Sequence, residues 1–322
     1  MAKSDKDNEL RLVRVFDAPV KLVWDVWTDD KHIVNWWGPR GFTLTTKSKD
    51  IRPGGKWVYT MHGPDGVDYP NFTTYHEVVE HSKLVYDHGG NEEGAALFRV
   101  TVTFTEVDNK TVMDMIMALE SAEAAKGIEG HIKDVGGNTT WDRLSEYLEE
   151  KQRDKDVFVI NRSFNTDQET LFKLWTDPQH FASWMGPTGS SMKPIESSVK
   201  EGGSLWYSMA NADGSQMFGK VNYKKIQAHD LLIYTQNFCD ENGDLSKPPF
   251  APTWPDSMLT TVRFYSEGPH ETRIALQWEV EGAVSEVEAK TFNEAKPGMS
   301  GGWTGSFDKL NALVELLSDY SG

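Results

Sequence analysis

Cysteine is almost absent from this sequence, since Cys239 is the single thiol in 322 residues. One cysteine cannot build an internal disulfide framework or a cysteine-based metal cage, and it fits a reducing compartment. Long apolar runs are absent too: no stretch of eighteen apolar residues occurs, and residues 1–10 are polar and charged rather than a secretory leader. We therefore expect a soluble protein with a cytoplasmic location and no membrane partner.

Positive charge is scarce relative to negative charge. Thirty-three Lys and Arg stand against forty-nine Asp and Glu, which gives a formal net charge of -16. Such a surface repels phosphate backbones and anionic membranes, and no basic run is long enough to reverse that effect. Nucleic acid is therefore not expected as a partner, and solubility is the simplest explanation of the acidity.

The sequence also lacks the short motifs of common enzyme classes. No G-x-S-x-G, H-E-x-x-H or paired C-x-x-C pattern occurs. The glycine pairs at 54–55 and 202–203 lack the Lys-Ser/Thr of a nucleotide-binding loop, so they are interpreted as turn glycines. The histidines are scattered, without the regular spacing of a zinc or iron site. We expect no cofactor and no metal, and these absences favour a protein that is not an enzyme.

A long internal repeat is the strongest positive feature. Residues 27–29 (W-T-D) recur as 175–177, and residues 36–39 (W-W-G-P) recur as 184–187 (W-M-G-P), both at an offset of 148. Further along the chain the offset grows to 160 and then to 166, so the second copy carries insertions, chiefly between Gln236 and Met258. The repeat predicts two domains, at residues 1–152 and 153–322.

Each copy shows the same order of expected elements. Residues 10–16 and 157–164 alternate apolar and polar side chains as half-buried strands do. A helical section follows and ends near the W-x-G-P motif, then several strands separated by turn signals, then a final amphipathic helix. This order predicts an α+β fold in which a curved antiparallel sheet wraps on a long C-terminal helix.

The motifs themselves resemble a known family. The pattern "R-x-F-x-A-P … W-T-D … W-W-G-P … D-x-R-x-G-G-x-W-x-Y-x-M … G-P-D-G … Y-x-E-V … L-V-Y" is carried by Arg14, Phe16, Ala18, Pro19, 27–29, 36–39, Asp50, Arg52, Gly54, Gly55, Trp57, Tyr59, Met61, 63–66, Tyr75, Glu77, Val78 and 84–86. It resembles the Hsp90-ATPase-activator-like (AHSA1-type) family of the Bet v 1/START-like (SRPBCC) superfamily. The second copy resembles it through 184–187, 202–203, 252–255, 302–303 and 307–310.

That resemblance implies two helix-grip domains, each with an interior cavity, and a small hydrophobic ligand or an Hsp90-type chaperone as partner. The second copy departs from the pattern, because residues 198–201 stand where the first copy has Asp50 and Arg52. If those two charged residues serve a ligand, the two cavities are not equivalent.

Aromatic side chains on the strands are the candidates for a cavity lining. Strand alternation places Trp57, Tyr59 and Met61 on one face, and the repeat places their counterparts likewise. From the residues alone, a filled core and an open pocket are about equally compatible with this pattern, and the resemblance favours the pocket. The full set of candidates is Trp37, Trp57, Tyr59, Met61, Tyr75, Leu205, Tyr207, Met209, Tyr223 and Trp254.

Two Asp-His pairs are the weak candidates for catalysis. His32 and His180 follow Asp29 and Asp177 by three residues, a spacing that brings side chains together on a helix. Such a pair can act as a general base. The alternative, which we favour, is that each aspartate caps a short helix, since no nucleophile is placed nearby.

The leading functional hypothesis is non-catalytic binding of a small hydrophobic or aromatic ligand in the helix-grip cavities. A first alternative is a co-chaperone-like protein that interacts with an Hsp90-type chaperone. A second alternative is a cyclase-like or hydrolase-like enzyme of the same superfamily, with the Asp-His pair or Tyr59 and Tyr75 as acid-base groups.

Overall fold

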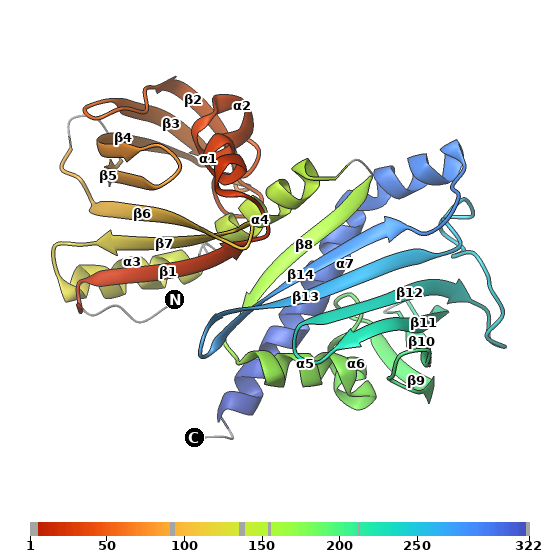
Figure 1. The fold of residues 1–322 in the computed structure, drawn as a ribbon. Coiled ribbons are helices and arrows are strands. Elements are labelled where there is room, and N and C mark those ends of the chain that lie inside the picture. The colour runs from red at the N-terminus through yellow and green to blue at the C-terminus, as the bar shows by residue number, and fades with distance from the viewer. Residues whose placement is uncertain (1–5, 91–93, 135–138, 154–155, 212, 320–322) are drawn as a thin grey trace. The chain divides into compact units, whose positions relative to one another are not determined.

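The computed structural model describes residues 6–90, 94–134, 139–153, 156–211 and 213–319. The chain divides into two compact units, Met1–Gln152 and Arg153–Gly322, which we call unit one and unit two. Over the described residues, each unit contains a seven-stranded antiparallel sheet with helices packed against it. The predicted α+β fold with two helix-grip domains is confirmed (Figure 1).

In unit one the first strand pairs with the last, and the other strands follow in a meander. The sheet order is β1-β7-β6-β5-β4-β3-β2. Two short helices separate β1 from β2, and two longer helices close the unit. The elements are β1 Glu9–Phe16, α1 Val20–Thr28, α2 Asp30–Ile33, β2 Thr43–Lys49, β3 Lys56–His62, β4 Asp68–Val79, β5 Lys83–Gly89, β6 Phe98–Val107, β7 Lys110–Ala118, α3 Ala122–Asp134 and α4 Thr139–Lys151.

Unit two repeats this topology with the order β8-β14-β13-β12-β11-β10-β9. It differs by a single helix, α7, in place of α3 and α4, and by a segment at 240–257 between β12 and β13. The elements are β8 Val157–Phe164, α5 Gln168–Thr176, α6 Pro178–Trp184, β9 Ser191–Ser197, β10 Ser204–Ala210, β11 Gln216–Gln227, β12 Leu231–Cys239, β13 Met258–Gly268, β14 Glu271–Val280 and α7 Glu286–Asp319.

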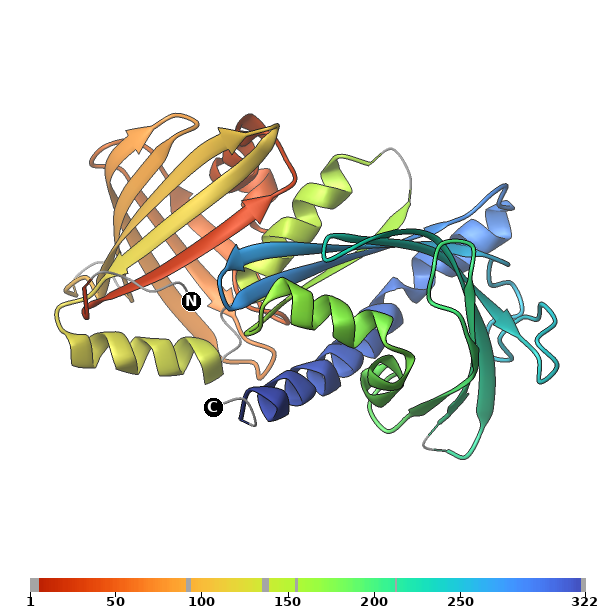
Figure 2. The same ribbon diagram turned by 60° about the horizontal axis from the view of Figure 1, so that its bottom comes forward.

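The alternating sequence of the strands produces the core. Along β1 every second side chain is buried, beginning with Leu10, and these side chains face the helices. In unit two, Figure 2 shows the sheet curving around α7. The helix places Phe292, Trp303, Phe307 and Leu310 into one continuous core with residues of the sheet. Burial of this apolar surface is the main driving force that closes the sheet on the helix.

Helix α7 begins with a reciprocal cap. The Ser285 hydroxyl accepts the Glu288 backbone N–H at 3.3 Å, and the Ser285 backbone N–H donates to the Glu288 carboxylate at 3.0 Å. This capping box satisfies two of the N–H groups that a helix start leaves unpaired. Over the described part of the chain, no helix is long and apolar enough to cross a membrane.

Candidate functional site

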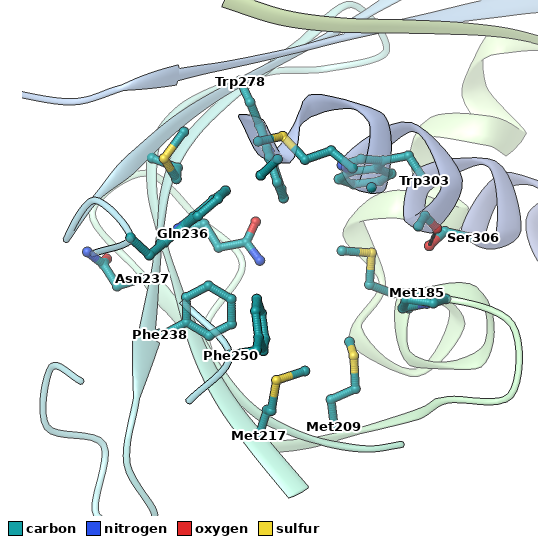
Figure 3. A pocket seen from close by; sticks show the side chains of 18 of the residues that line it. Met185, Met209, Met217, Gln236, Asn237, Phe238, Phe250, Trp278, Trp303 and Ser306 are labelled. Carbon is teal, nitrogen blue, oxygen red and sulfur yellow. Dashed lines mark hydrogen bonds between the residues drawn. The ribbon is translucent and has the colours of Figure 1, made fainter. Parts of the chain in front are cut away.

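A cavity of about 520 Å³ lies in unit two between the sheet, α7 and the 240–257 segment. Figure 3 shows its side chains arranged around an open centre. Its volume falls within the range of about 300–1,000 Å³ that is usual for small-molecule sites. The described residues in its wall are Met185, Gly186, Pro187, Tyr207, Met209, Met217, Phe218, Gln236, Asn237, Phe238, Phe250, Trp254, Met258, Trp278, Glu294, Ala295, Gly298, Met299, Gly302, Trp303 and Ser306.

Sulfur and aromatic rings dominate this wall. It holds five methionines together with aromatic side chains from the sheet, the 240–257 segment and α7. Methionine is flexible and polarizable, so it adapts its shape to a ligand and makes favourable contacts with aromatic rings. Among the described residues of the wall there is no lysine, arginine or histidine, and its carboxylate, Glu294, is exposed. The interior is therefore suited to an uncharged molecule.

One polar pair interrupts the apolar interior. The Gln236 side-chain amide donates to the Tyr207 hydroxyl at 2.9 Å, while the Gln236 Oε1 atom is buried without a partner among the described residues. Burial raises the pKa of Tyr207 to about 12, although the Gln236 hydrogen bond acts in the opposite direction, so the phenol stays protonated at neutral pH.

Gly219 makes room for that tyrosine. It lies opposite Tyr207 in the register of β10 with β11, and a Cβ atom at this glycine would be 2.3 Å from the Tyr207 hydroxyl oxygen. A residue with a side chain would therefore displace the ring. The glycine lets the hydroxyl cross β11 and reach Gln236 on β12.

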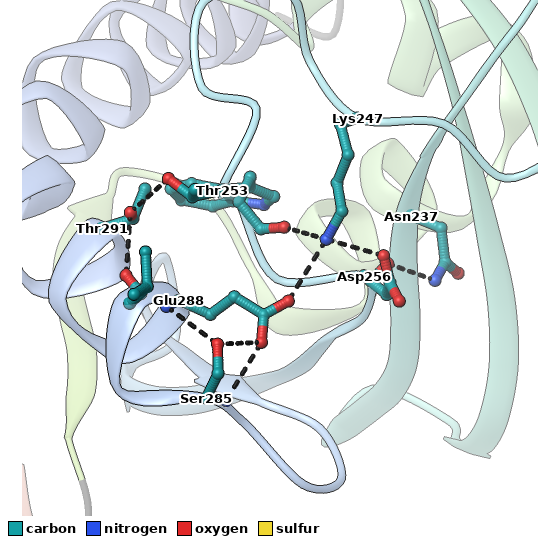
Figure 4. A network of polar contacts seen from close by, with 9 residues as sticks. Asn237, Lys247, Thr253, Asp256, Ser285, Glu288 and Thr291 are labelled. Carbon is teal, nitrogen blue, oxygen red and sulfur yellow. Dashed lines mark hydrogen bonds and ion pairs between the residues drawn. The ribbon is translucent and has the colours of Figure 1, made fainter.

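The segment at 240–257 forms one side of the cavity through Phe250 and Trp254. Lys247 binds it to the start of α7, because its ammonium group contacts Asp256 at 2.7 Å, Glu288 at 3.3 Å and the Trp254 carbonyl oxygen. Figure 4 shows this network together with a second link, the contact between the Thr253 and Thr291 hydroxyls at 2.7 Å. The segment is thus held in place as one wall of the cavity.

Glycines on α7 leave space on the helix side of the cavity. Gly298 and Gly302 are both in the wall, although glycine in a helix interior costs about 1 kcal/mol relative to alanine. A Cβ atom at Gly298 would meet no atom within 4 Å, so packing does not require the glycine. At Gly305, by contrast, a Cβ atom would be 2.8 Å from the Thr188 hydroxyl, so close approach of the chain explains that residue.

The corresponding cavity of unit one, between its sheet and α4, is smaller, at about 210 Å³. A separate cavity of about 490 Å³ lies beside α1, with the charged side chains of Asp29, Asp30 and Lys49 in its wall. Two tryptophans stand where unit two has smaller side chains: Trp57 stacks on Tyr59 with 3.9 Å between ring centroids, and the Trp37 indole N–H donates to the Tyr59 hydroxyl at 3.3 Å. The equivalent positions in unit two hold Leu205 and Met185. The wall of the unit-one cavity contains Leu12, Trp37, Gly38, Pro39, Tyr59, Met61, Tyr86, His88, Phe98, Val100, Met115, Met117, Ile132, Thr140 and Trp141.

Six of the ten aromatic and apolar residues predicted to line the cavities lie in their walls, and four lie in the surrounding core. Those in the walls are Trp37, Tyr59, Met61, Tyr207, Met209 and Trp254. Those in the core are Trp57, Tyr75, Leu205 and Tyr223. Tyr75 packs edge-on against Tyr86, and Tyr223 packs in the same way against Tyr234, which leaves neither ring facing an opening.

The four weak catalytic candidates are not arranged as dyads. The Asp29 carboxylate accepts the Lys31 backbone N–H at 2.8 Å, and the His32 ring contacts the Tyr147 hydroxyl at 2.9 Å. The Asp177 carboxylate accepts the backbone N–H groups of Gln179 and His180, and these hydrogen bonds lower its pKa. Both aspartates thus act as helix caps.

Several charged or reactive residues lie away from the cavities. Asp50 and Arg52 form an ion pair at 2.8 Å with both side chains exposed, in the turn between β2 and β3. Cys239 is buried, and burial raises its thiol pKa, which disfavours the reactive thiolate.

The sequence predicted Tyr207 but not its partner Gln236, and it did not predict most of the helix side of the wall. The residues concerned include Met217, Gln236, Phe238, Phe250, Trp278, Gly298 and Met299. Two signals could have found some of them. Gln236 and Phe238 continue the alternation of β12, and the run of glycines at 298, 301, 302 and 305 is unusual for a helix.

Comparison with known proteins supports the repeat. The family model described as Activator of Hsp90 ATPase homolog 1-like protein matches residues 17–149 and 165–315. Solved structures similar to the chain include a protein from Arthrobacter aurescens, at 28% identity over 46% of this chain and 90% of that one, with a TM-score of 0.43. An AHSA1 protein from Silicibacter pomeroyi is 18% identical over 50% of this chain and 99% of its own, with a TM-score of 0.39.

A two-domain structure also resembles the chain. The di-domain ARO/CYC BexL from the BE-7585A biosynthetic pathway is 12% identical over 94% of this chain and 97% of that one, with a TM-score of 0.39. No curated protein matches the chain. Because the family model covers most of both units, the chain belongs to the Activator of Hsp90 ATPase homolog 1-like family and carries two of its domains in tandem.

Proposed function

We propose that this protein binds a small hydrophobic or aromatic molecule in the unit-two cavity without transforming it. The observation that carries the proposal is the apolar cavity of about 520 Å³, lined by methionines and aromatic rings. Apolar burial supplies affinity in such a site, and a few polar groups fix the orientation of the ligand.

The arrangement of ionisable groups favours binding over catalysis. Burial raises the pKa values of Tyr59 and Tyr75, so neither phenol is poised to exchange a proton near neutral pH. The carboxylates of Asp29 and Asp177 are engaged in helix caps. These features argue against the cyclase-like and hydrolase-like alternative.

Unit one has a different part in this proposal. The unit-one cavity that corresponds to the unit-two site has a volume of about 210 Å³, below the usual size of a ligand site, and Trp57 stacks on Tyr59 beside it. We assign ligand binding to unit two and a structural role to unit one.

Native mass spectrometry of the freshly purified full chain tests the proposal. The expected result is an excess mass over the 36.4 kDa chain that is lost on denaturation and recovered in an organic extract. A second arm adds an extract of host cells to protein that was denatured, washed and refolded. If neither arm gives a bound species, the proposal fails, and co-purification with an Hsp90-type chaperone then tests the partner that the family description suggests.

A further inference from the structure

We propose that the unit-two cavity selects an uncharged aromatic molecule that carries a hydroxyl group, and that the Gln236–Tyr207 pair recognises this hydroxyl. The inference rests on the proposed function and names the ligand class for the same site. In Figure 3 the Gln236 amide projects from the sheet toward the centre of the cavity.

The free donors and acceptors of the Gln236–Tyr207 pair define which ligand group can bind to it. Gln236 donates to the Tyr207 oxygen, which leaves the Tyr207 O–H as a donor and the Gln236 Oε1 as an unpartnered acceptor. With the amide turned over, Tyr207 donates to Gln236, and the free groups become both amide N–H groups and the tyrosine oxygen. In either orientation the pair keeps at least one free donor and at least one free acceptor. A hydroxyl group, which both donates and accepts, satisfies both.

The charges of the wall disfavour a negatively charged ligand group. No described residue of the wall is basic, so a buried carboxylate or phosphate would meet no cation, and Glu294 would repel it. An unpaired charge in such surroundings is strongly disfavoured, whereas a neutral hydroxyl needs only its hydrogen bonds. The pKa of Tyr207, raised to about 12, keeps the pair itself neutral.

The shape and composition of the cavity favour a flat ring system. Met209 and Met217 face Trp278 and Trp303 across the open centre in Figure 3. Thioether sulfurs contact aromatic edges favourably, and ring pairs add to this through stacked or edge-on arrangements. Aliphatic chains would gain the burial but not these contacts.

The same positions in unit one lack this polar pair. At the offset of 148, His88 stands in place of Gln236, and its ring stacks on Phe98 with 4.9 Å between centroids. Tyr59, the counterpart of Tyr207, already accepts the Trp37 indole N–H. Recognition of a hydroxyl is therefore a property of unit two, and unit one supplies a matched control within the same chain.

Calorimetric titration of the full chain with three probes tests the inference. The probes are 2-naphthol, 2-methylnaphthalene, which replaces the hydroxyl by a methyl group of similar size, and 2-naphthoate, which carries a negative charge. We expect Gln236→Met to weaken 2-naphthol binding about tenfold, the effect of one net hydrogen bond, while 2-methylnaphthalene binds at least as tightly as before. Binding of 2-naphthoate should be the weakest of the three in the wild-type protein.

Two further variants keep the result interpretable. Tyr207→Phe removes only the hydroxyl oxygen and should also reduce the preference for 2-naphthol, whereas Tyr59→Phe in unit one should leave all three affinities unchanged. Equal effects of Gln236→Met on 2-naphthol and 2-methylnaphthalene, or none on either, would overturn the inference and leave ligand binding intact. Failure of the wild-type protein to bind any of the probes also overturns it, and native mass spectrometry then decides separately whether the proposed function stands.

Discussion

Trp303 on α7 lies nearly parallel to Trp175 on α5, with 6.1 Å between ring centroids and 11° between ring planes. Unit one contains the same arrangement, since Trp141 stacks on Trp27 at 5.5 Å and 20°. The repeat at an offset of 166 pairs Trp141 with Phe307, however, and not with Trp303. Trp27 and Trp175 are equivalent in the repeat, but the tryptophans that stack on them come from different turns of the C-terminal helices of the two units.

The helix caps lead to a first prediction. Replacing Asp177 by alanine should lower the free energy of unfolding by about 1 kcal/mol, because the backbone N–H groups of Gln179 and His180 lose their acceptor. Asp177→Ser, which restores a capping oxygen, should recover most of the loss. Urea denaturation measures both effects. If alanine instead abolished ligand binding at unchanged stability, the Asp-His pair would have to act on the ligand.

The half-buried His88 of unit one gives a prediction on pH. Burial lowers the pKa of His88 to about 4, below the ordinary value of 6.5, so the folded protein holds this ring neutral. Between pH 6.5 and 4 the unfolded chain binds a proton that the folded chain does not, and stability falls as the pH falls. The loss should be on the order of 2 kcal/mol for this half-buried ring.

Thermal unfolding at pH 7.5 and pH 4.5 measures this effect. His88→Phe removes the titrating group, so its melting temperature should fall less between the two pH values than that of the wild-type protein. His270→Gln, which removes an exposed imidazole of unit two, serves as the control and should follow the wild-type protein. Equal pH sensitivity of His88→Phe and the wild type would contradict the prediction.

The anchor of the 240–257 segment gives a third prediction. Lys247→Ala removes contacts with Asp256, Glu288 and the Trp254 carbonyl oxygen. Exposed ion pairs contribute about 1 kcal/mol or less, so global stability should change little. Amide hydrogen exchange in the segment should rise, because its local opening becomes easier. The control is Lys21→Ala, which breaks an exposed pair with Asp25 in unit one. Unaltered exchange in the segment would show that other contacts hold the wall.

Periodicity in the sequence predicted the fold and part of the site, because it reports which face a side chain lies on. Tyr59 and Tyr207 fall on the inner face of their strands, and both lie in cavity walls. Tyr75 and Tyr223 also face inward but are covered by neighbouring rings. Alternation along a strand predicts which face of the sheet a side chain lies on, but not how deeply neighbouring side chains cover it. It could therefore not distinguish a residue of the packed core from a residue of the cavity wall.

The remaining wall residues depend on long-range packing. Strand β11 lies between β10, which carries Tyr207, and β12, which carries Gln236. The two side chains meet because Gly219 on β11 leaves room for the tyrosine ring to cross that strand. Trp303 reaches the cavity because a single helix crosses the sheet in unit two. Neither contact is encoded in a local pattern, so the spacing of residues could not indicate it.

Two glycines on α7 provide the sharpest test of the cavity. Gly298 lies in the wall and Gly301 does not, although a Cβ atom would meet no atom within 4 Å at either position. Gly298→Leu should fill part of the open volume and abolish or strongly weaken ligand binding. Gly301→Leu should leave binding unchanged.

Both variants should raise the melting temperature by a few degrees, because replacing an interior glycine gains about 0.8–1 kcal/mol of helix propensity in a 34-residue helix. Because both variants gain similar stability, a difference in ligand binding between them cannot be caused by a difference in stability. Native mass spectrometry and thermal unfolding on the same samples then separate occupancy of the cavity from stability. Loss of the ligand in Gly298→Leu alone would show that this glycine keeps the site open. Retained ligand in both variants would place the bound molecule elsewhere in the chain.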